Sequence, residues 1–121
     1  MEEFEMISTK PGKWHRAAAI SDIEDDDVLG VLLGDQGEHE VALYKIQGNY
    51  YATADRCTHQ TARLSDGLVI DDCIECPLHQ GRFHIPTGKA KSAPVSFNLK
   101  TYPAKVEQDV IYVLIEDIQF D

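Results

Sequence analysis

The sequence predicts an all-β protein, an antiparallel β-sandwich base into which a small subdomain is inserted. From Trp14 onward the chain divides into short apolar runs separated by turn residues. These runs recur at roughly eight to twelve residues, a spacing typical of sandwiches and barrels. No segment shows a convincing helical period. A chain of 121 residues is also long enough to form one domain with a core of its own.

The expected strands follow one another along the chain, each bounded by polar turn residues. Turns at Gly34–Gly37 and Gln47–Asn49 separate early strands, and Asp71-Asp72 and Gln108-Asp109 join later ones. Between the first two strands, Ser21–Asp27 is expected to form one capped turn at most. The expected strands are Trp14–Ala18, Val28–Leu33, Val41–Ile46, Tyr50–Thr53, Leu68–Ile70, Cys73–Glu75, Arg82–His84, Tyr102–Glu107 and Val110–Ile115.

The chain is organised as one domain with a nested insertion. Residues 1–12 show no periodicity and end in Lys10-Pro11-Gly12, so we expect a loose N-terminal extension before a domain at 13–118. A hairpin from Leu68 to Glu75 is expected to turn the chain back on itself. We therefore expect a subdomain at about 55–95 that is inserted into the strands of the base.

Two short motifs contain the residues best suited to bind a metal. They are Cys57-Thr58-His59 and Cys76-Pro77-Leu78-His79, and each offers one thiolate and one imidazole. Cys57 and His59 point the same way in an extended segment. Cys76 and His79 need a tight turn, for which Pro77 presets φ. Two such loops that meet would place two sulfurs and two nitrogens around one inorganic centre.

Residue types alone leave two kinds of centre open. Two cysteines and two histidines also bind zinc, but zinc fingers take the cysteines as one close pair and the histidines as another. Both pairs are mixed here, which suits a dinuclear iron centre with the thiolates on one iron and the imidazoles on the other. A third cysteine, Cys73, forms C-x-x-C with Cys76. We expect Cys73 to be a small apolar residue on a strand.

The two motifs resemble the C-x-H…C-x-x-H signature of the Rieske family. From Trp14 to about Glu116 the chain is similar to the Rieske ferredoxins of multicomponent aromatic-ring-hydroxylating dioxygenases, and most similar to the naphthalene-dioxygenase type. The resemblance implies a Rieske fold and one [2Fe–2S] cluster whose iron ligands are Cys57, His59, Cys76 and His79, with the histidines facing solvent. Further matching runs are Ser65-Asp66-Gly67, Glu75–Phe83, Thr87–Ala90 and Lys100–Pro103.

The same resemblance implies a one-electron carrier and not an enzyme. The protein would be a monomer that takes electrons from a flavin-containing ferredoxin reductase and delivers them to a terminal Rieske non-haem iron oxygenase. One alternative is a Rieske small subunit held permanently in an oxidoreductase complex. Another is a zinc-stabilised interaction module, which would be colourless, whereas a Rieske protein is red-brown.

Residues near the ligands imply a low reduction potential. High-potential Rieske proteins carry a disulfide between the two loops, at positions that correspond to Ala62 and Leu78. They also carry hydroxyl donors at positions that correspond to Gly81 and Phe83. Fewer donors stabilise the added negative charge less, so the reduced state is less favoured.

Four residues beside the ligands are candidates for contact with a partner: Gln60, Leu78, Gln80 and Pro94. Gln60 and Gln80 each follow a ligand histidine, where glycine is common in relatives, and solvated loop residues are the alternative. Pro94 resembles part of the family's third loop, which covers the cluster, and an ordinary turn proline is the alternative. His84 lies where relatives often have aspartate, and no function is assigned to it.

Composition excludes several classes of function. Eleven basic and 21 acidic residues give a net charge of −10, which argues against nucleic acid as a partner. The acidity permits steering towards a basic partner surface, and it equally serves solubility. No apolar run approaches the roughly 20 residues of a membrane span, and Met1–Met6 does not resemble a secretory signal. Two of the three cysteines are needed for metal, so we expect no disulfide framework and a cytoplasmic protein.

Overall fold

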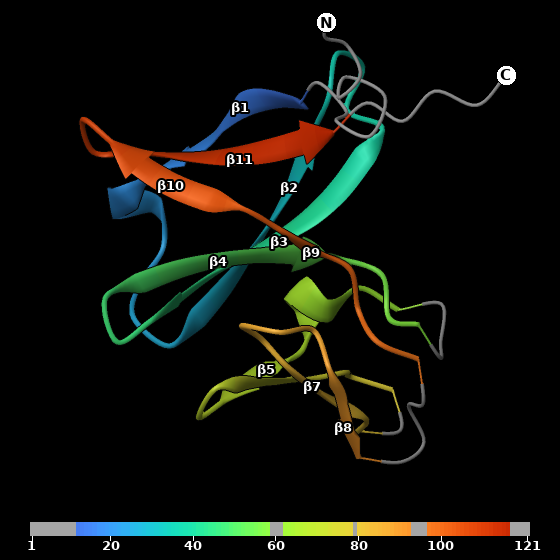
Figure 1. Ribbon diagram of the computed structural model, residues 1–121. Coiled ribbons are helices and arrows are strands. Elements are labelled where there is room, and N and C mark those ends of the chain that lie inside the picture. Colours follow the sequence, from blue (N-terminus) through green and yellow to red (C-terminus); the bar gives the residue numbers. More distant parts are fainter. Residues whose placement is uncertain (1–11, 59–61, 79, 93–96, 117–121) are drawn as a thin grey trace, which may run out of the picture.

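The strands of this chain pair antiparallel throughout the part that the computed structural model describes, residues 12–58, 62–78, 80–92 and 97–116 (Figure 1). The prediction of an all-β fold is therefore confirmed. The strands are β1 (Gly12–Ala19), β2 (Asp27–Leu33), β3 (His39–Ile46), β4 (Asn49–Ala54), β5 (Leu68–Ile70), β6 (Cys73–Glu75), β7 (Arg82–His84), β8 (Ala90–Ser92), β9 (Thr101–Tyr102), β10 (Ala104–Glu107) and β11 (Val110–Glu116), with 3₁₀ turns η1 (Ile20–Asp22) and η2 (Leu64–Asp66).

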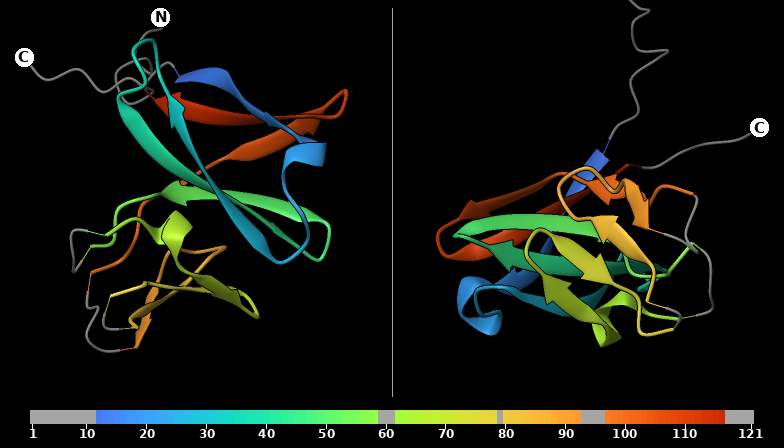
Figure 2. Two further views of the ribbon diagram at one scale, coloured as in Figure 1. Left: turned by 180° about the vertical axis from the view of Figure 1, so that it is seen from behind. Right: turned by 90° about the horizontal axis from the view of Figure 1, so that it is seen from below.

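Three sheets are stacked as layers (Figures 1 and 2). The first sheet has the order β1-β11-β10, the second β2-β3-β4-β9 and the third β5-β6-β7-β8. The second sheet is the middle layer, because it shares one core with the first sheet and another with the third. We call these the upper core and the lower core, after their places in Figure 1. The first two sheets form the expected sandwich base.

Strand β3 is buried on both faces because it lies in the middle layer. Val41 and Leu43 point into the upper core, whereas Ala42, Tyr44 and Ile46 point into the lower core. This arrangement explains why four consecutive residues, Val41 to Tyr44, are all apolar. In a strand with one face exposed to solvent, apolar residues would alternate with polar ones. Side chains of alternate residues leave a strand on opposite sides, so one strand supplies both cores.

The buried hydroxyl of Tyr44 has its hydrogen bond supplied by the neighbouring strand. The Thr53 hydroxyl donates to the carbonyl of Ala54 at 2.8 Å, and Tyr44 Oη donates in turn to Thr53 Oγ1 at 2.8 Å. Burial raises the pKa of Tyr44 well above its ordinary value, with a smaller opposing contribution from Thr53. A buried polar group with its partner in place does not carry the full cost of desolvation.

Most expected strands are observed, with differences that have physical causes. The first strand begins at Gly12, which pairs with Glu116, and not at Trp14. The expected strand Tyr102–Glu107 is two strands, because the chain changes sheets at Pro103: β9 pairs with β4, and β10 pairs with β11. Strand β8 and turn η2 were not expected. At the predicted capped turn, η1 forms, and Asp22 Oδ2 accepts a hydrogen bond from the Ala19 amide at 3.0 Å.

The third sheet interrupts the second in the order of the chain. The chain leaves the second sheet after β4, forms β5 to β8, and returns to it at β9. The expected hairpin is present, with Leu68 opposite Glu75 and Ile70 opposite Cys73. The domain limits 13–118 and 55–95 stay predictions. In the part of the chain that is described, no helix is long and apolar enough to cross a membrane.

Candidate metal centre

The two motif loops are built in the same way. The amide of Cys57 donates to the carbonyl of Ala62 at 3.0 Å, and the amide of Cys76 donates to the carbonyl of Gly81 at 2.8 Å. Both loops therefore have the same length between the closing groups, and each begins at its cysteine. The chain segments that flank the loops lie together on the right of Figure 1.

Ion pairs stand at the base of each loop, where the chain enters and leaves it. Arg56 Nε lies 3.1 Å from Glu40 Oε1, and Arg63 Nε lies 3.9 Å from the same oxygen. At the second loop, Arg82 Nε lies 3.3 Å from Glu75 Oε2. These pairs are partly exposed, so each contributes little to stability. They nevertheless connect the two sides of each loop.

The motif cysteines bring their thiols together at the lower core. Cys57 is 7% exposed and Cys76 is 1% exposed. Burial raises the pKa of the Cys76 thiol, and the neighbouring Cys57 thiol raises it further. The backbone N–H of Leu78 has the opposite effect, because it donates to the sulfur of Cys76, but the net direction of the pKa is upward.

A pair of buried thiols in contact suits a metal centre. Two thiolates side by side in an apolar surrounding repel each other, so both lose their protons only when a cation compensates their charge. The Leu78 N–H also stabilises the thiolate form of Cys76. Within the described residues, none of the three cysteines forms a disulfide. The residues present therefore fit a centre that takes Cys57 and Cys76 as thiolates.

Several predicted site residues lie outside the described residues. These are His59, His79, Gln60 and Pro94. Within the described ranges, no group of three or more histidine, cysteine, aspartate or glutamate residues is placed to hold a metal ion. The complete ligand set thus stays a prediction, of which the structure describes the cysteine half.

A buried carboxylate fastens the first loop to turn η2. Asp55 is 4% exposed, and its two carboxylate oxygens accept hydrogen bonds from the amide and the hydroxyl of Ser65, both at 2.7 Å. The chain of β2 passes close by at Gly30, where a Cβ atom would lie 2.7 Å from Ser65 Oγ. We call this contact the Asp55–Ser65 clasp. Sequence reasoning included Ser65 only in a matching run and missed Asp55.

Glycine is required at position 67, where turn η2 lies against the strand that leads into the second loop. A Cβ atom at Gly67 would collide with the carbonyl oxygen of Glu75, the residue before Cys76. The close approach of these two backbones brings η2, and with it the first loop, against the strand that leads into the second. In the matching run Ser65-Asp66-Gly67, the first residue is thus needed for its hydrogen bonds to Asp55, and the last for the space it leaves beside Glu75.

Phe83 lies wholly buried in the lower core, in the cluster of side chains that also contains Cys57 and Cys76. Gly81 is buried as well. Neither side chain carries a hydroxyl, and the low reduction potential expected from these two positions stays a prediction. Leu78 and Gln80, the candidate partner contacts on the second loop, are both exposed, and Gln80 has a left-handed backbone with φ of 59°.

Cys73 and His84 take part in a separate polar group on the third sheet. Cys73 lies on β6 as expected, but it is only partly buried, and its thiol contacts Asp72 Oδ1 at 3.7 Å. Partial burial and the Asp72 carboxylate raise the pKa of Cys73. His84 Nε2 lies 3.0 Å from Asp72 Oδ2, and its Nδ1 lies 2.7 Å from Thr87 Oγ1. These contacts connect the β5–β6 turn to the chain after β7.

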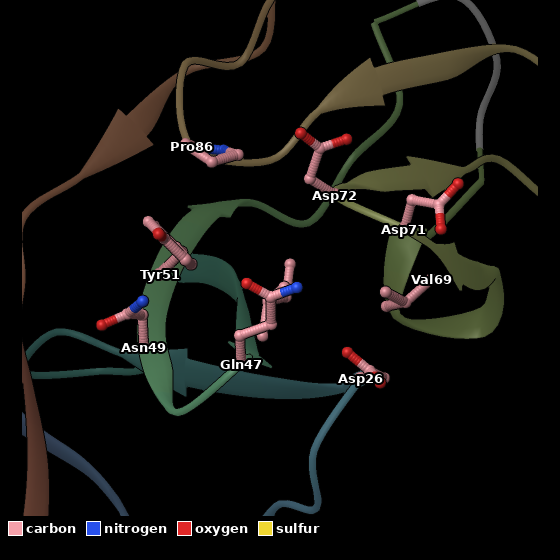
Figure 3. A pocket seen from close by; sticks show the side chains of 9 residues that line it. Asp26, Gln47, Asn49, Tyr51, Val69, Asp71, Asp72 and Pro86 are labelled. Carbon is pink, nitrogen blue, oxygen red and sulfur yellow. The ribbon is translucent and has the colours of Figure 1, made fainter.

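A surface hollow of about 560 Å³ opens between the β3–β4 turn and the β5–β6 turn (Figure 3). Asp26, Asp71 and Asp72 stand around it, and their carboxylates point in different directions. Its lining includes neither Cys57 nor Cys76. The hollow is therefore separate from the thiol pair, and its three carboxylates are not among any group of described residues placed to hold a metal ion.

Comparisons with known proteins agree with the chemistry of the thiol pair. The family described as Rieske [2Fe-2S] domain matches residues 13–103. The chain is 56% identical over 95 residues to the ferredoxin component of the naphthalene 1,2-dioxygenase system of Pseudomonas putida, covering 78% of this chain and 88% of that one.

Solved structures show the same likeness. A chain in the complex of reduced oxygenase and oxidized ferredoxin in carbazole 1,9a-dioxygenase has a TM-score of 0.76 and 34% identity, over 81% of this chain and 98% of that chain. The Sphingomonas yanoikuyae B1 ferredoxin has a TM-score of 0.75 and 32% identity, over 91% of this chain and 100% of that chain.

Proposed function

This chain belongs to the Rieske [2Fe–2S] domain family, and we propose that Cys57, His59, Cys76 and His79 are the ligands of its cluster. The observation that carries the proposal is the contact between two buried thiols, each at the start of a loop of the same construction. His59 and His79 follow in the same two loops. When bound, a cluster of this type takes up and releases one electron at a time.

The protein is the electron-transfer component of a multicomponent dioxygenase system and not its catalytic oxygenase. Its own residues hold the thiolates and keep water from them. Leu64 and Phe83, both wholly buried, pack in the core that contains the two cysteines. The second loop, by contrast, exposes Leu78 and Gln80. An electron must pass between proteins at an exposed edge close to the cluster, and this loop is such an edge.

We assign a flavin-containing ferredoxin reductase as the electron donor and a terminal Rieske non-haem iron oxygenase as the acceptor. The names of the relatives support the assignment, because they are ferredoxin components of dioxygenase systems. The net charge of −10 suits partners with basic docking surfaces. We also infer a cytoplasmic location, because two of the three cysteines are assigned to the cluster and no disulfide framework is left.

The ligand assignment is tested by removing one candidate at a time. Changing any of Cys57, His59, Cys76 or His79 to alanine is expected to abolish the red-brown colour or make it unstable. Cys73→Ala is the control, and it should retain its full content of iron and sulfide. Loss of the cluster from the Cys73 variant, with retention in any of the other four, would show that the ligands are assigned wrongly.

A freely diffusing carrier differs from a permanent subunit in how it purifies. We expect the protein to elute from gel filtration as a coloured monomer and to restore activity when added to separate reductase and oxygenase. Co-elution with a catalytic chain, at a fixed ratio that survives high salt, would favour a held Rieske subunit instead.

A further inference from the structure

Phe97 is the most exposed of the large apolar side chains that the structure describes, at 72%. It belongs to neither the upper nor the lower core. Single exposed apolar residues are common on protein surfaces and need no explanation by themselves. Phe97 differs from them in its attachment, because its backbone is fixed to the first motif loop.

Hydrogen bonds fix the chain at the carbonyl of Phe97 and at the two residues that follow it. Thr58 Oγ1 donates to the carbonyl of Phe97 at 2.9 Å, and Thr58 is the residue directly after Cys57. Asn98 Oδ1 accepts from the amide of Ala90 at 3.0 Å. The amide of Leu99 donates to the carbonyl of Gly88 at 2.7 Å, and the Leu99 side chain is buried in the lower core beside the cysteines.

The fixed backbone makes Phe97 a prepared contact. Binding that must first order a loop loses part of its free energy to that ordering, and a side chain on an ordered backbone loses less. Aromatic side chains, with few rotatable bonds and a large apolar area, supply a large share of the contact energy in small interfaces. Phe97 has both properties, and it stands next to the loop that begins at Cys57.

Leu78 is an exposed apolar residue on the second loop. It is 45% exposed and lies between Cys76 and His79. Leu78, Gln80 and Phe97 are all uncharged, in a protein whose net charge is −10. Depletion of charged residues is typical of the core of a protein–protein interface.

We infer that Phe97 is the apolar anchor of the surface that docks onto the terminal oxygenase, where it fills an apolar pocket, with Leu78 as a secondary contact. The inference rests on the proposed function. The oxygenase is chosen as the occupant because a chain 34% identical to this one occurs in a complex with an oxygenase. Binding by the reductase at the same residue is an outcome that the test distinguishes.

The test compares Phe97→Ala with Leu32→Ala in the cluster-loaded protein. Leu32 is 63% exposed on β2 and serves as the matched control for the loss of an exposed apolar side chain. The partner is the purified terminal oxygenase of a naphthalene 1,2-dioxygenase, and the dissociation constant is measured by surface plasmon resonance. We expect Phe97→Ala to weaken binding about tenfold, mainly by faster dissociation, and Leu32→Ala to leave it unchanged. Phe97→Leu should recover part of the affinity.

Each outcome separates the anchor from the function on which it rests. If Phe97→Ala binds the oxygenase as tightly as the unchanged protein, Phe97 is not the anchor. If it weakens only the complex with the reductase, the occupant is assigned wrongly. Absorption and EPR spectra of every variant report the cluster independently of binding. A native protein without a Rieske spectrum, or one with a cluster that binds no oxygenase, would contradict the proposed function itself.

Discussion

Removing one hydroxyl from the Asp55–Ser65 clasp tests how the first motif loop is held. Ser65→Ala removes the donor that lies 2.7 Å from Asp55 Oδ2 and keeps the amide that lies 2.7 Å from Oδ1. A hydrogen bond to a charged group contributes about 1.5–3 kcal/mol. Because Ser65 is only partly buried, water can replace part of that bond. We therefore expect a loss of about 1.5–2 kcal/mol, which lowers the melting temperature of a domain of this size by roughly 5–10 °C.

The assay follows thermal bleaching of the visible absorption together with far-ultraviolet circular dichroism. Ser21→Ala is the control, because Ser21 is an exposed serine in η1, away from the clasp. Since the clasp leads directly into the loop that begins at Cys57, bleaching in Ser65→Ala should occur at lower temperature than in the control. Equal bleaching temperatures in the two variants would refute the claim that the clasp holds the loop.

Three further predictions concern other parts of the molecule. The native protein should have a potential near the low end of the Rieske range, about −150 mV, and Phe83→Tyr should raise it if the new hydroxyl reaches a cysteine sulfur; a positive native potential in voltammetry would contradict this. Gln80→Gly and Gln47→Gly both relieve a left-handed backbone, with φ of 59° and 52°. Each should stabilise the fold by about 0.5–1 kcal/mol, since the relief of about 1–2 kcal/mol exceeds the entropic cost of glycine. Gln80→Glu should slow electron delivery to the oxygenase, because it places a charge on the candidate docking surface, whereas Gln47→Glu should not; equal delivery by these two variants would remove Gln80 from the docking surface. The raised pKa of Tyr44 means that the folded state keeps a proton which the unfolded state loses above about pH 10. Stability should therefore fall as the pH rises beyond that value, and Tyr44→Phe, which leaves Thr53 bonded to Ala54, should weaken this fall in urea unfolding measured at pH 9 and 11.

The strands that could be predicted are those whose limits are set by local chemistry. Leu68–Ile70, Cys73–Glu75 and Arg82–His84 are observed with the predicted limits, because turn residues bound them closely. Strand β8, Ala90–Ser92, could not be predicted, since Ala-Lys-Ser has no apolar alternation and becomes a strand by pairing with β7. Pro103 changes sheets inside one continuous apolar pattern, which periodicity does not detect.

Some features of the candidate site could likewise be predicted from local sequence, and others could not. The spacing and type of the motif residues predicted that Cys57 and Cys76 would meet, and their thiols are in contact. The Asp55–Ser65 clasp and the bond from Thr58 to Phe97 depend on which backbones approach in three dimensions. No spacing in the sequence marks such partners. The sequence offered two weak signals of the clasp. One is a polar residue, Asp55, two positions before Cys57, and the other is a glycine within an expected strand, Gly30.

The two cysteines of the thiol pair come from loops attached to two different sheets, and this determines which substitutions can change the distance between their sulfurs. The first loop leaves the second sheet after β4, and the second loop is the turn between β6 and β7 of the third sheet. The distance between the two sulfurs therefore depends on how the two sheets pack through the lower core, where Tyr44 and Phe83 are wholly buried. Close-packed cores respond to volume changes as small as one methylene. We therefore expect substitutions in the lower core to disturb the spacing of the two thiols more than substitutions in the upper core, whose buried residues form a separate cluster from the one that contains both cysteines.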